Sequence, residues 1–224
     1  MTPEALAALF AAKTLLIFDF DGTLADSSPL HARAFNAAFA PWNVEVDYTA
    51  IAGLTTEAAV AKIIVQNGLA MGPDERRSIV SNKRAVVRRL IDEELTPING
   101  AVAFVGRAKP RYKLALCTSG SRGTVTASLD RIGLAGCFDP VITAEDVRSK
   151  PDPEGYLRVL AEHQTFTKDA LVFEDSASGL AAAEAAGIDA ICIVEAHRKG
   201  VAPGPCLATS TWPPLSQALA EPAL

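Results

Sequence analysis

The sequence predicts an α/β protein in which a parallel sheet carries helices on both faces and a small helical block follows the first strand. Three observations support this prediction. Residues 15–18 form a short apolar run that ends at a turn signal, which is typical of a strand buried on both faces. After residue 97, strand-like runs alternate with helical patterns, and this alternation indicates βαβ units. The intervening residues 26–95 show helical periodicity and no convincing strand.

The first elements of the chain are a helix and a strand. Apolar side chains recur at helical spacing over residues 1–12, so a helix is predicted there. The strand over residues 15–18 leads directly into two aspartates, and Gly22 then allows the backbone to turn sharply. The carboxyl end of this strand is where open α/β sheets place their active sites.

Three helices are predicted in the helical block, each beginning at a residue that favours helix starts and the first two ending at a proline or a glycine. They cover the segment from Ser27 or Ser28 to a stop before Pro41, the segment from Thr55 or Thr56 to Gly68, and residues 73 to about 94. The chain crosses between this block and the rest near Asp26 and Pro97 only, so we expect two hinges there. We therefore expect a helical cap domain over residues 26–95 and a core domain over residues 1–25 and 96–224.

The second part of the core is predicted to complete a Rossmann-like sheet. Strands are expected over residues 113–118, 140–143, 170–173 and 190–194, and the last of these is the final strand that we expect. Helices are expected over residues 122–132, 153–162 and 177–186, with glycine at the ends of the first and the third. The tail from Val201 is rich in proline and is predicted to wrap the surface and end in a short helix without a chemical role.

Composition limits the class of protein. Of the 224 residues, 49% are hydrophobic and 21% are charged, which is typical of a soluble globular protein. The net charge of −5 argues against nucleic acid as a partner. No apolar run reaches the roughly 20 residues that span a bilayer, and the first 12 residues lack a signal-peptide pattern. The four cysteines are far apart, as in a reduced compartment, so we expect a cytoplasmic protein, acting as a monomer, with no membrane partner.

Asp19 and Asp21 follow the first strand and are the first candidates for chemistry. A carboxylate has a reference pKa near 4, so it is ionised at neutral pH and can act as a nucleophile without a base to activate it. The alternative is an ordinary Asp-Gly turn that closes a strand.

Three later strand ends also carry polar residues. Thr118 and Ser119 precede a predicted helix, where small residues and the helix amino terminus suit an anion, although they could simply cap that helix. Lys150 precedes a proline in a stiff loop, or it could be a solvated linker residue. Glu174 and Asp175 end the strand over residues 170–173, and Asp175 could serve partly as a helix cap.

These strand ends should meet at one edge of a parallel sheet, which would gather four carboxylates. Two like charges about 4 Å apart repel by about 4 kcal/mol at an effective dielectric of 20, so such a cluster needs cations. Lys150 supplies one. A hard divalent ion suits the oxygen ligands, and Mg²⁺ is the usual ion where phosphate shares the site.

The motifs together resemble those of the haloacid dehalogenase-like superfamily, over nearly the whole chain. Residues 19–23 resemble its first motif, Thr118 its second, Lys150 its third and residues 174–175 its fourth. The block over residues 26–95 resembles its C1 cap. Within the superfamily, the chain is most similar to the phosphatases and phosphosugar mutases related to β-phosphoglucomutase.

This resemblance implies a role for each motif residue. Asp19 would be the nucleophile that forms an aspartyl-phosphate, and Asp21 would protonate the leaving oxygen and then activate water. Thr118, Ser119 and Lys150 would bind the phosphoryl oxygens.

The resemblance also implies a metal site. Asp19, the main-chain carbonyl of Asp21 and Asp175 would bind Mg²⁺, and Glu174 would assist directly or through water.

The branch of the superfamily depends on four further residues. His31 and Lys83 match active-site residues of β-phosphoglucomutase-like enzymes, although either could lie on a solvated helix face. Thr56 stands where the mutases carry an arginine that grips a second phosphate, and threonine lacks that bidentate charge. Arg122 ends a segment that resembles the loop of sugar- and polyol-phosphate phosphatases. Asp21 argues against dehalogenation, because dehalogenases lack this second aspartate.

We therefore expect hydrolysis of a small phosphorylated metabolite, such as a sugar or polyol phosphate. A phosphosugar mutase is the alternative. A non-catalytic binding protein on the same fold is a further alternative, but it should lack at least one of Asp19, Asp21, Lys150 and Asp175, and the chain has all four.

Overall fold

Six parallel strands form one sheet in the computed structural model, which describes residues 1–194 and 204–220. The strand order is β3-β2-β1-β4-β5-β6, with β1 near the centre. Because both neighbours of β1 run parallel to it, its carboxyl end lies beside those of β2 and β4. The strands are β1 Leu15–Phe18, β2 Lys113–Cys117, β3 Val141–Ile142, β4 Ala170–Glu174, β5 Asp189–Ile193 and β6 Ala208–Ser210.

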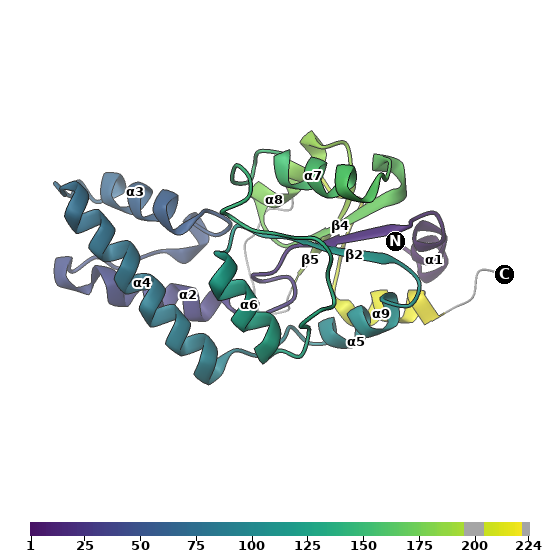
Figure 1. The fold of residues 1–224 in the computed structure, drawn as a ribbon, viewed down its shortest axis with the longest axis horizontal. Coiled ribbons are helices and arrows are strands. Elements are labelled where there is room, and N and C mark those ends of the chain that lie inside the picture. Colours follow the sequence, from purple (N-terminus) through teal and green to yellow (C-terminus); the bar gives the residue numbers. More distant parts are fainter. Residues whose placement is uncertain (195–203, 221–224) are drawn as a thin grey trace.

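Helices cover both faces of this sheet, and Figure 1 shows them as layers above and below the strands. Alternate residues of β1 point to opposite faces. Leu16 and Phe18 pack in a cluster with α1, α5, α6 and α9, whereas Leu15 and Ile17 pack with α7 and α8. The helices are α1 Pro3–Ala11, α5 Ala101–Ala108, α6 Arg122–Arg131, α7 Glu154–His163, α8 Ala177–Ala185 and α9 Trp212–Ala220, with a 3₁₀ turn at Thr167–Asp169.

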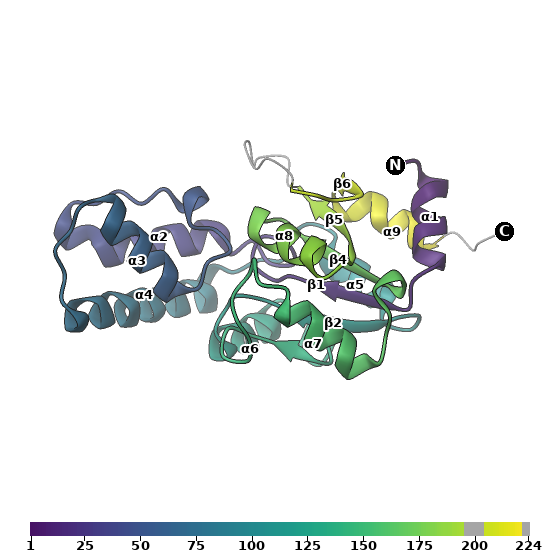
Figure 2. The same cartoon turned by 90° about the horizontal axis from the view of Figure 1, so that it is seen from above.

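A block of helices extends from the sheet and gives the molecule an elongated shape (Figure 2). It comprises α2 Ser28–Phe39, α3 Thr56–Gln66 and α4 Pro73–Glu94, with 3₁₀ turns at Ala40–Trp42 and Tyr48–Ala50. The block has its own apolar cluster, centred on residues such as Phe39, Ile63 and Ile79. Residues 26–95 are all described and contain no strand. The outer part of the block thus has its own core, whereas residues of α2 and α4 such as Leu30 and Leu90 pack in the same cluster as Leu16 and Phe18 of the sheet.

Two chain segments connect the block to the sheet, and they run side by side. Asp26 N donates to Thr96 O at 2.9 Å, and Ala25 forms an antiparallel bridge with Pro97. The predicted crossing points therefore lie against each other. That the block and the rest of the chain are separate cap and core domains remains a prediction.

The α/β class, the parallel sheet and the helices on both faces are confirmed. The position of β1 and the bounds of α4 are those predicted, and most other elements differ by one or two residues. The prediction that β5 is the last strand is wrong, because β6 pairs with β5 through the register of Cys192 and Thr209. Helix α5 was not expected.

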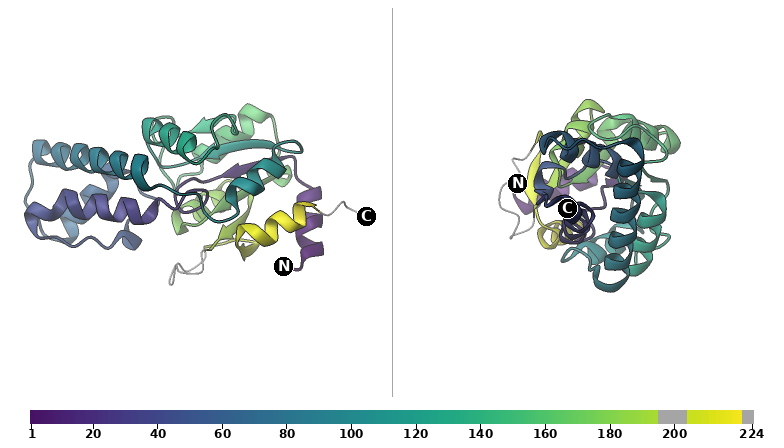
Figure 3. Two further views of the ribbon diagram at one scale, coloured as in Figure 1. Left: turned by 90° about the horizontal axis from the view of Figure 1, so that it is seen from below. Right: turned by 90° about the vertical axis from the view of Figure 1, so that its left-hand side faces the viewer.

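The predicted surface wrap at the carboxyl end is only partly correct. Its start at Val201 lies outside the described residues, and the predicted terminal helix is α9. However, Trp212 at the start of α9 is fully buried and packs against Phe18 and Phe104, with ring centroids 5.9 and 4.7 Å apart. Helices α1 and α9 lie together at the end of the molecule far from the helical block (Figure 3). Among residues 1–194 and 204–220, no helix is long and apolar enough to cross a membrane.

Candidate active site

Asp19 lies at the carboxyl end of β1 and is the centre of the site. Its backbone N donates to Phe173 O on β4 at 2.9 Å, which fixes it to the sheet edge. Lys150 is buried, and its Nζ donates to Asp19 Oδ1 at 2.6 Å, to Glu174 Oε1 at 2.6 Å and to the main-chain carbonyl of Cys117 at 2.8 Å. An ammonium has three protons, so these three acceptors use all of them. Lys150 therefore joins the ends of β1, β2 and β4.

Glu174 is fully buried, and both of its carboxylate oxygens have several donors. Besides Lys150, Oε1 accepts a hydrogen bond from the Tyr156 hydroxyl at 3.3 Å. Oε2 accepts from Asp175 N and Ser176 N, each at 2.9 Å, and from Ser176 Oγ at 3.0 Å. A side chain at Gly179 would overlap this carboxylate, so glycine is required there. Glu174 thus stabilises the loop after β4 and fixes Lys150.

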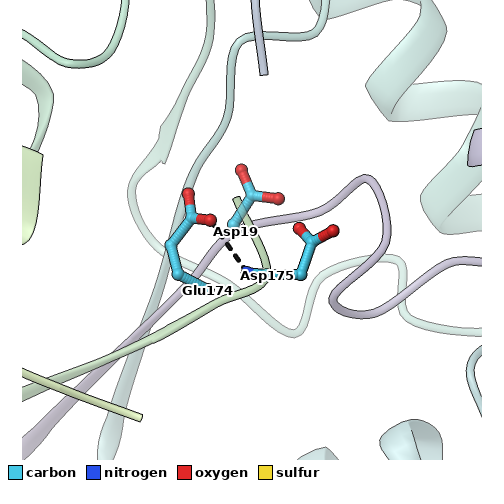
Figure 4. Close-up of side chains that lie close together, drawn as sticks. All are labelled: Asp19, Glu174 and Asp175. Carbon is cyan, nitrogen blue, oxygen red and sulfur yellow. Dashed lines mark hydrogen bonds between the residues drawn. The ribbon is translucent and has the colours of Figure 1, made fainter. Parts of the chain in front are cut away.

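Three buried carboxylates, those of Asp19, Glu174 and Asp175, lie close together (Figure 4), and Lys150 contacts two of them. Asp19, Glu174 and Asp175 each offer one oxygen, and these oxygens lie within 4.8 Å of one another. Thr23 Oγ1 donates to Asp175 Oδ1 at 3.2 Å. The cluster is an all-oxygen donor set of the kind that hard divalent ions prefer. Because the hydrogen bonds of Glu174 use both of its oxygens, Asp19 and Asp175 are the better ligands.

The charge balance of the cluster also favours a bound cation. Burial, followed by the charge of Glu174, raises the pKa of Asp19 to about 8, although Lys150 opposes this effect. A nucleophilic carboxylate has to be ionised, and at neutral pH such a pKa would leave it largely protonated. A divalent cation at the cluster would lower that pKa, because a nearby positive charge favours the charged form. The residues present therefore fit a magnesium ion.

Asp21 points towards the helical block, where residues of α2 approach it. Ser27 Oγ donates to Asp21 Oδ1, and His31 Nε2 lies 3.6 Å from the same oxygen. Burial, followed by the positive charge of Lys83, lowers the pKa of His31 to about 4. His31 is therefore neutral at pH 7. Ser27 precedes α2 at the predicted cap position but makes no capping hydrogen bond, since its hydroxyl serves Asp21.

Lys83 of α4 is buried in the block beside His31, so it does not lie on a solvated face. Its Nζ lies 3.1 Å from His31 Nδ1 and 3.5 Å from Thr56 Oγ1, and it sits 4.7 Å from the centre of the Phe35 ring. Burial lowers the pKa of Lys83 to about 8, so it stays mostly charged at pH 7. The structure brings together three of the four residues predicted to select substrate: His31, Thr56 and Lys83.

The predicted phosphate-binding loop lies on the other side of Asp21. Thr118 Oγ1 accepts a hydrogen bond from Gly120 N at 3.0 Å. A Cβ on Gly120 would lie 3.5 Å from Asp21 Oδ2, so the loop backbone passes close to that carboxylate. Ser119 Oγ is buried and has no hydrogen-bond partner among the described residues. A buried hydroxyl without a partner is costly, so this one marks a place where a ligand oxygen would be stabilised.

Arg122 lies away from this group. Among the described residues, those that line the cavity include Ser121 and Thr124 but not Arg122, whose guanidinium instead donates to Asp146. The structure therefore does not favour a direct role for Arg122 in choosing the substrate.

A cavity between the block and the sheet joins these residues. The sheet edge lines one side of it with Asp19, Asp21, Lys150, Asp175, Thr118 and Ser119. The block lines the rest with His31, Thr56, Lys83 and the aromatic side chains of Phe35 and Tyr48.

The loop before α3 closes this cavity on one side. Gly53 has φ +81°, and a Cβ there would overlap Ser178 Oγ and lie 3.1 Å from Ser176 Oγ. The block and the sheet edge are therefore in direct contact.

Sequence reasoning missed several of these residues. Tyr156 was not predicted, yet its ring lies 5.2 Å from Lys150 Nζ and its hydroxyl bonds Glu174. The signal that could have pointed to Tyr156 is its position six residues after Lys150, on the first turn of α7. The contact of Gly53 with Ser178 had no local signal, because it joins segments that are distant in the sequence.

The chain is similar to proteins of known family. Residues 16–193 match the family model described as haloacid dehalogenase-like hydrolase. A fructose-1-phosphate phosphatase of Escherichia coli, YqaB, is 28% identical over 179 residues, which are 79% of this chain and 94% of that protein.

Solved structures are similar as well. The crystal structure of CbbY from Rhodobacter sphaeroides in complex with phosphate has a TM-score of 0.77 at 25% identity, covering 88% of this chain and 93% of CbbY. A putative beta-phosphoglucomutase from Thermotoga maritima has a TM-score of 0.69 at 26% identity, covering 92% and 98% of the two chains.

Proposed function

Because this chain belongs to the haloacid dehalogenase-like hydrolase family, we propose that it is a Mg²⁺-dependent phosphatase of a small phosphorylated sugar or polyol. The observation that carries the proposal is the contact of Lys150 with Asp19 beside the buried oxygen cluster. This arrangement supplies a nucleophile, a fixed positive charge and a place for a divalent cation. Phosphoryl transfer depends mainly on such positioning and charge neutralisation.

The chain's own residues account for both half-reactions. Asp19 attacks the phosphorus atom, the bond to the leaving oxygen breaks, and an aspartyl-phosphate forms. Asp21 gives its proton to the leaving oxygen and later takes a proton from the water that hydrolyses the aspartyl-phosphate. Thr118 and Ser119 donate hydrogen bonds to the phosphoryl oxygens, and Lys150 neutralises the charge between them and Asp19.

A magnesium ion at this site would be held by Asp19, Asp175 and the main-chain carbonyl of Asp21. It would neutralise charge on the transferring phosphoryl group. We assign Glu174 a different role from the ligand predicted from the sequence, because both of its oxygens accept hydrogen bonds from the protein. Its role is to orient Lys150 and the loop that carries Asp175.

We further propose that residues 26–95 form a cap domain that opens and closes over a core of residues 1–25 and 96–224. The paired segments at Ala25 and Pro97 would be the hinge, since the chain crosses between the two parts only there. Opening would admit the substrate, and closure would exclude water from Asp19 while the ester reacts.

The substrate class is inferred from the cavity and the relatives. The fructose-1-phosphate phosphatase similarity supports a sugar phosphate. The alternative of a phosphosugar mutase has support from the likeness to the putative beta-phosphoglucomutase. A mutase has to bind a bisphosphate, and Thr56 contributes only a neutral hydroxyl that lies 3.5 Å from Lys83. Because a neutral hydroxyl cannot bind a second phosphate as an arginine would, Thr56 favours hydrolysis over the mutase reaction.

A panel of sugar and polyol phosphates tests the proposal. We expect inorganic phosphate to be released with Mg²⁺ and not with excess chelator. With glucose 1-phosphate, free phosphate should appear faster than glucose 6-phosphate. Faster formation of glucose 6-phosphate would favour the mutase, and no reaction with any ester would contradict the proposed function.

A further inference from the structure

The loop that we propose to bind the phosphoryl group is hydrogen-bonded to a second loop. Residues 118–121 connect β2 to α6, and residues 143–146 follow β3. Thr118 N donates to Ile142 O at 3.0 Å, and Ala144 N donates to Gly120 O at 3.1 Å. The two backbones therefore run side by side at the edge of the site.

Asp146 links this second loop to α6. Its Oδ2 accepts from Thr143 N at 2.8 Å, lies 2.7 Å from Thr143 Oγ1 and also accepts from the guanidinium of Arg122. Thr143 is fully buried, and the Asp146 side chain is only 19% exposed. The end of β3 and the first residue of α6 are thus joined through one carboxylate oxygen.

Glu145 completes the link by capping α6 from outside the helix. The residue at the N-cap position, Ser121, makes no capping bond, because its Oγ donates to Thr124 Oγ1 at 2.9 Å. Glu145 Oε2 instead accepts from Arg122 N at 3.0 Å and lies 2.9 Å from Thr143 Oγ1. A side chain of the second loop therefore accepts the hydrogen bond of a backbone N–H at the start of α6, where the N-cap residue Ser121 accepts none.

These links matter because the loop they hold lies directly against the reacting groups. Ser119 Oγ is buried without a partner among the described residues, and Gly120 passes beside Asp21. Hydrogen-bond donors aimed at a phosphoryl oxygen have to be held within about 0.5 Å of the productive geometry. A displacement of about 1 Å can reduce a rate by about a hundredfold.

We propose that Glu145 and Asp146 are positioning residues for phosphoryl binding, and that Asp146 acts through Arg122. The inference rests on the proposed phosphatase function and deepens it. Arg122 then has two defined roles. It neutralises a carboxylate that would otherwise repel the incoming phosphoryl group, and it ties α6 to the second loop. Neither acid touches the substrate.

Binding of inorganic phosphate provides the test. Its dissociation constant is measured by calorimetry in the presence of Mg²⁺ for the wild type, Arg122→Ala, Asp146→Ala, Glu145→Ala and the double variant of Arg122 and Asp146, together with kcat and KM. We expect each single change to weaken phosphate binding about tenfold or more, with a parallel rise in KM. The double variant should be close to the single ones, because Asp146 and Arg122 act through the same contact.

A matched control is Arg88→Ala, which removes another arginine with an aspartate partner from an exposed helix surface. It should leave phosphate binding within about twofold of the wild type. The Arg122 side chain is 52% exposed, so Arg122→Ala should fold. This variant keeps the test valid even if Asp146→Ala does not fold. Wild-type binding and KM in both Arg122→Ala and Glu145→Ala would overturn this inference and leave the proposed function intact. A wild-type protein that neither binds phosphate nor hydrolyses any ester would overturn the proposed function as well.

Discussion

At the scale of single residues, the site is built from side chains that restrain one another. Lys150 uses its three protons on Asp19, Glu174 and the carbonyl of Cys117, and Glu174 is in turn held by the loop after β4. Asp19 and Lys150 could be predicted because each follows a recognisable local pattern. The use of each Glu174 oxygen could not, since it depends on how residues 174–179 turn in space.

The different roles of the two acids at the end of β4 lead to a first prediction. Asp175→Asn should raise the Mg²⁺ concentration for half-maximal activity by about tenfold or more, because the proposed metal site loses an ionised carboxylate. Glu174→Gln should lower kcat and stability through Lys150 while leaving the Mg²⁺ requirement near that of the wild type. Activity titrated against Mg²⁺ measures both. Equal shifts in the two variants would show that Glu174 is a ligand after all.

A second prediction concerns His31 and pH. The pKa of His31 is about 4 in the folded protein and about 6.5 when unfolded. Between these values the unfolded chain binds a proton that the folded protein does not, so stability is lost as pH falls from 6.5 towards 4. His31→Asn removes this loss.

The measurement is denaturant unfolding without Mg²⁺ at several pH values. The stability difference between wild type and His31→Asn should shift in favour of the variant by up to about 3 kcal/mol between pH 7 and pH 4.5. A difference that does not change with pH would mean that His31 keeps an ordinary pKa.

At the scale of helices and strands, strong periodicity made most elements predictable. The exceptions have physical causes. Helix α5 spans only eight residues and contains Gly106, so its pattern is short and interrupted by a poor helix former. Strand β6 has three residues at the edge of the sheet, and it forms because it pairs with β5 rather than because of the propensity of Ala208, Thr209 and Ser210. Trp212, which follows β6, is buried in the core. The prolines around it led to the prediction of a surface segment instead.

The contact between the loop before α3 and the start of α8 leads to a third prediction. Gly53→Ala should reduce kcat/KM about tenfold, because the added Cβ would overlap Ser178 Oγ and keep the block from seating on the sheet edge. Adding Ser178→Ala removes that oxygen and should restore part of the loss. Steady-state kinetics of the three proteins checks this.

Gly68→Ala is the matched control for the backbone. Gly68 also has positive φ, +61°, but no atom lies within 4 Å of a Cβ there, so alanine adds strain without a collision. It should lower stability by about 1 kcal/mol and leave kcat/KM unchanged. If both glycine variants behaved alike, backbone strain rather than the contact with Ser178 would explain the result.

At the scale of the whole molecule, the sheet positions the candidate active-site residues and the helical block covers the cavity that they line. The strand order puts the ends of β1, β2 and β4 side by side, so Asp19, Thr118 and Asp175 converge although they are far apart in the sequence. The block has an apolar cluster of its own, and the chain crosses between it and the sheet only at one pair of adjacent segments. This architecture suits the proposed reaction, in which Asp19 would react with an ester first and its phosphoryl group with water second.

The most direct test of this account is detection of the phosphorylated enzyme. The protein is mixed with Mg²⁺ and a reactive sugar phosphate, quenched in acid within the first turnover and digested, and the peptide that carries Asp19 is examined by mass spectrometry. We predict a phosphoryl group on Asp19 that appears and decays with turnover and is absent, together with activity, from Asp19→Asn. Turnover by Asp19→Asn within about tenfold of the wild type, or a phosphoryl group on another residue, would contradict the mechanism.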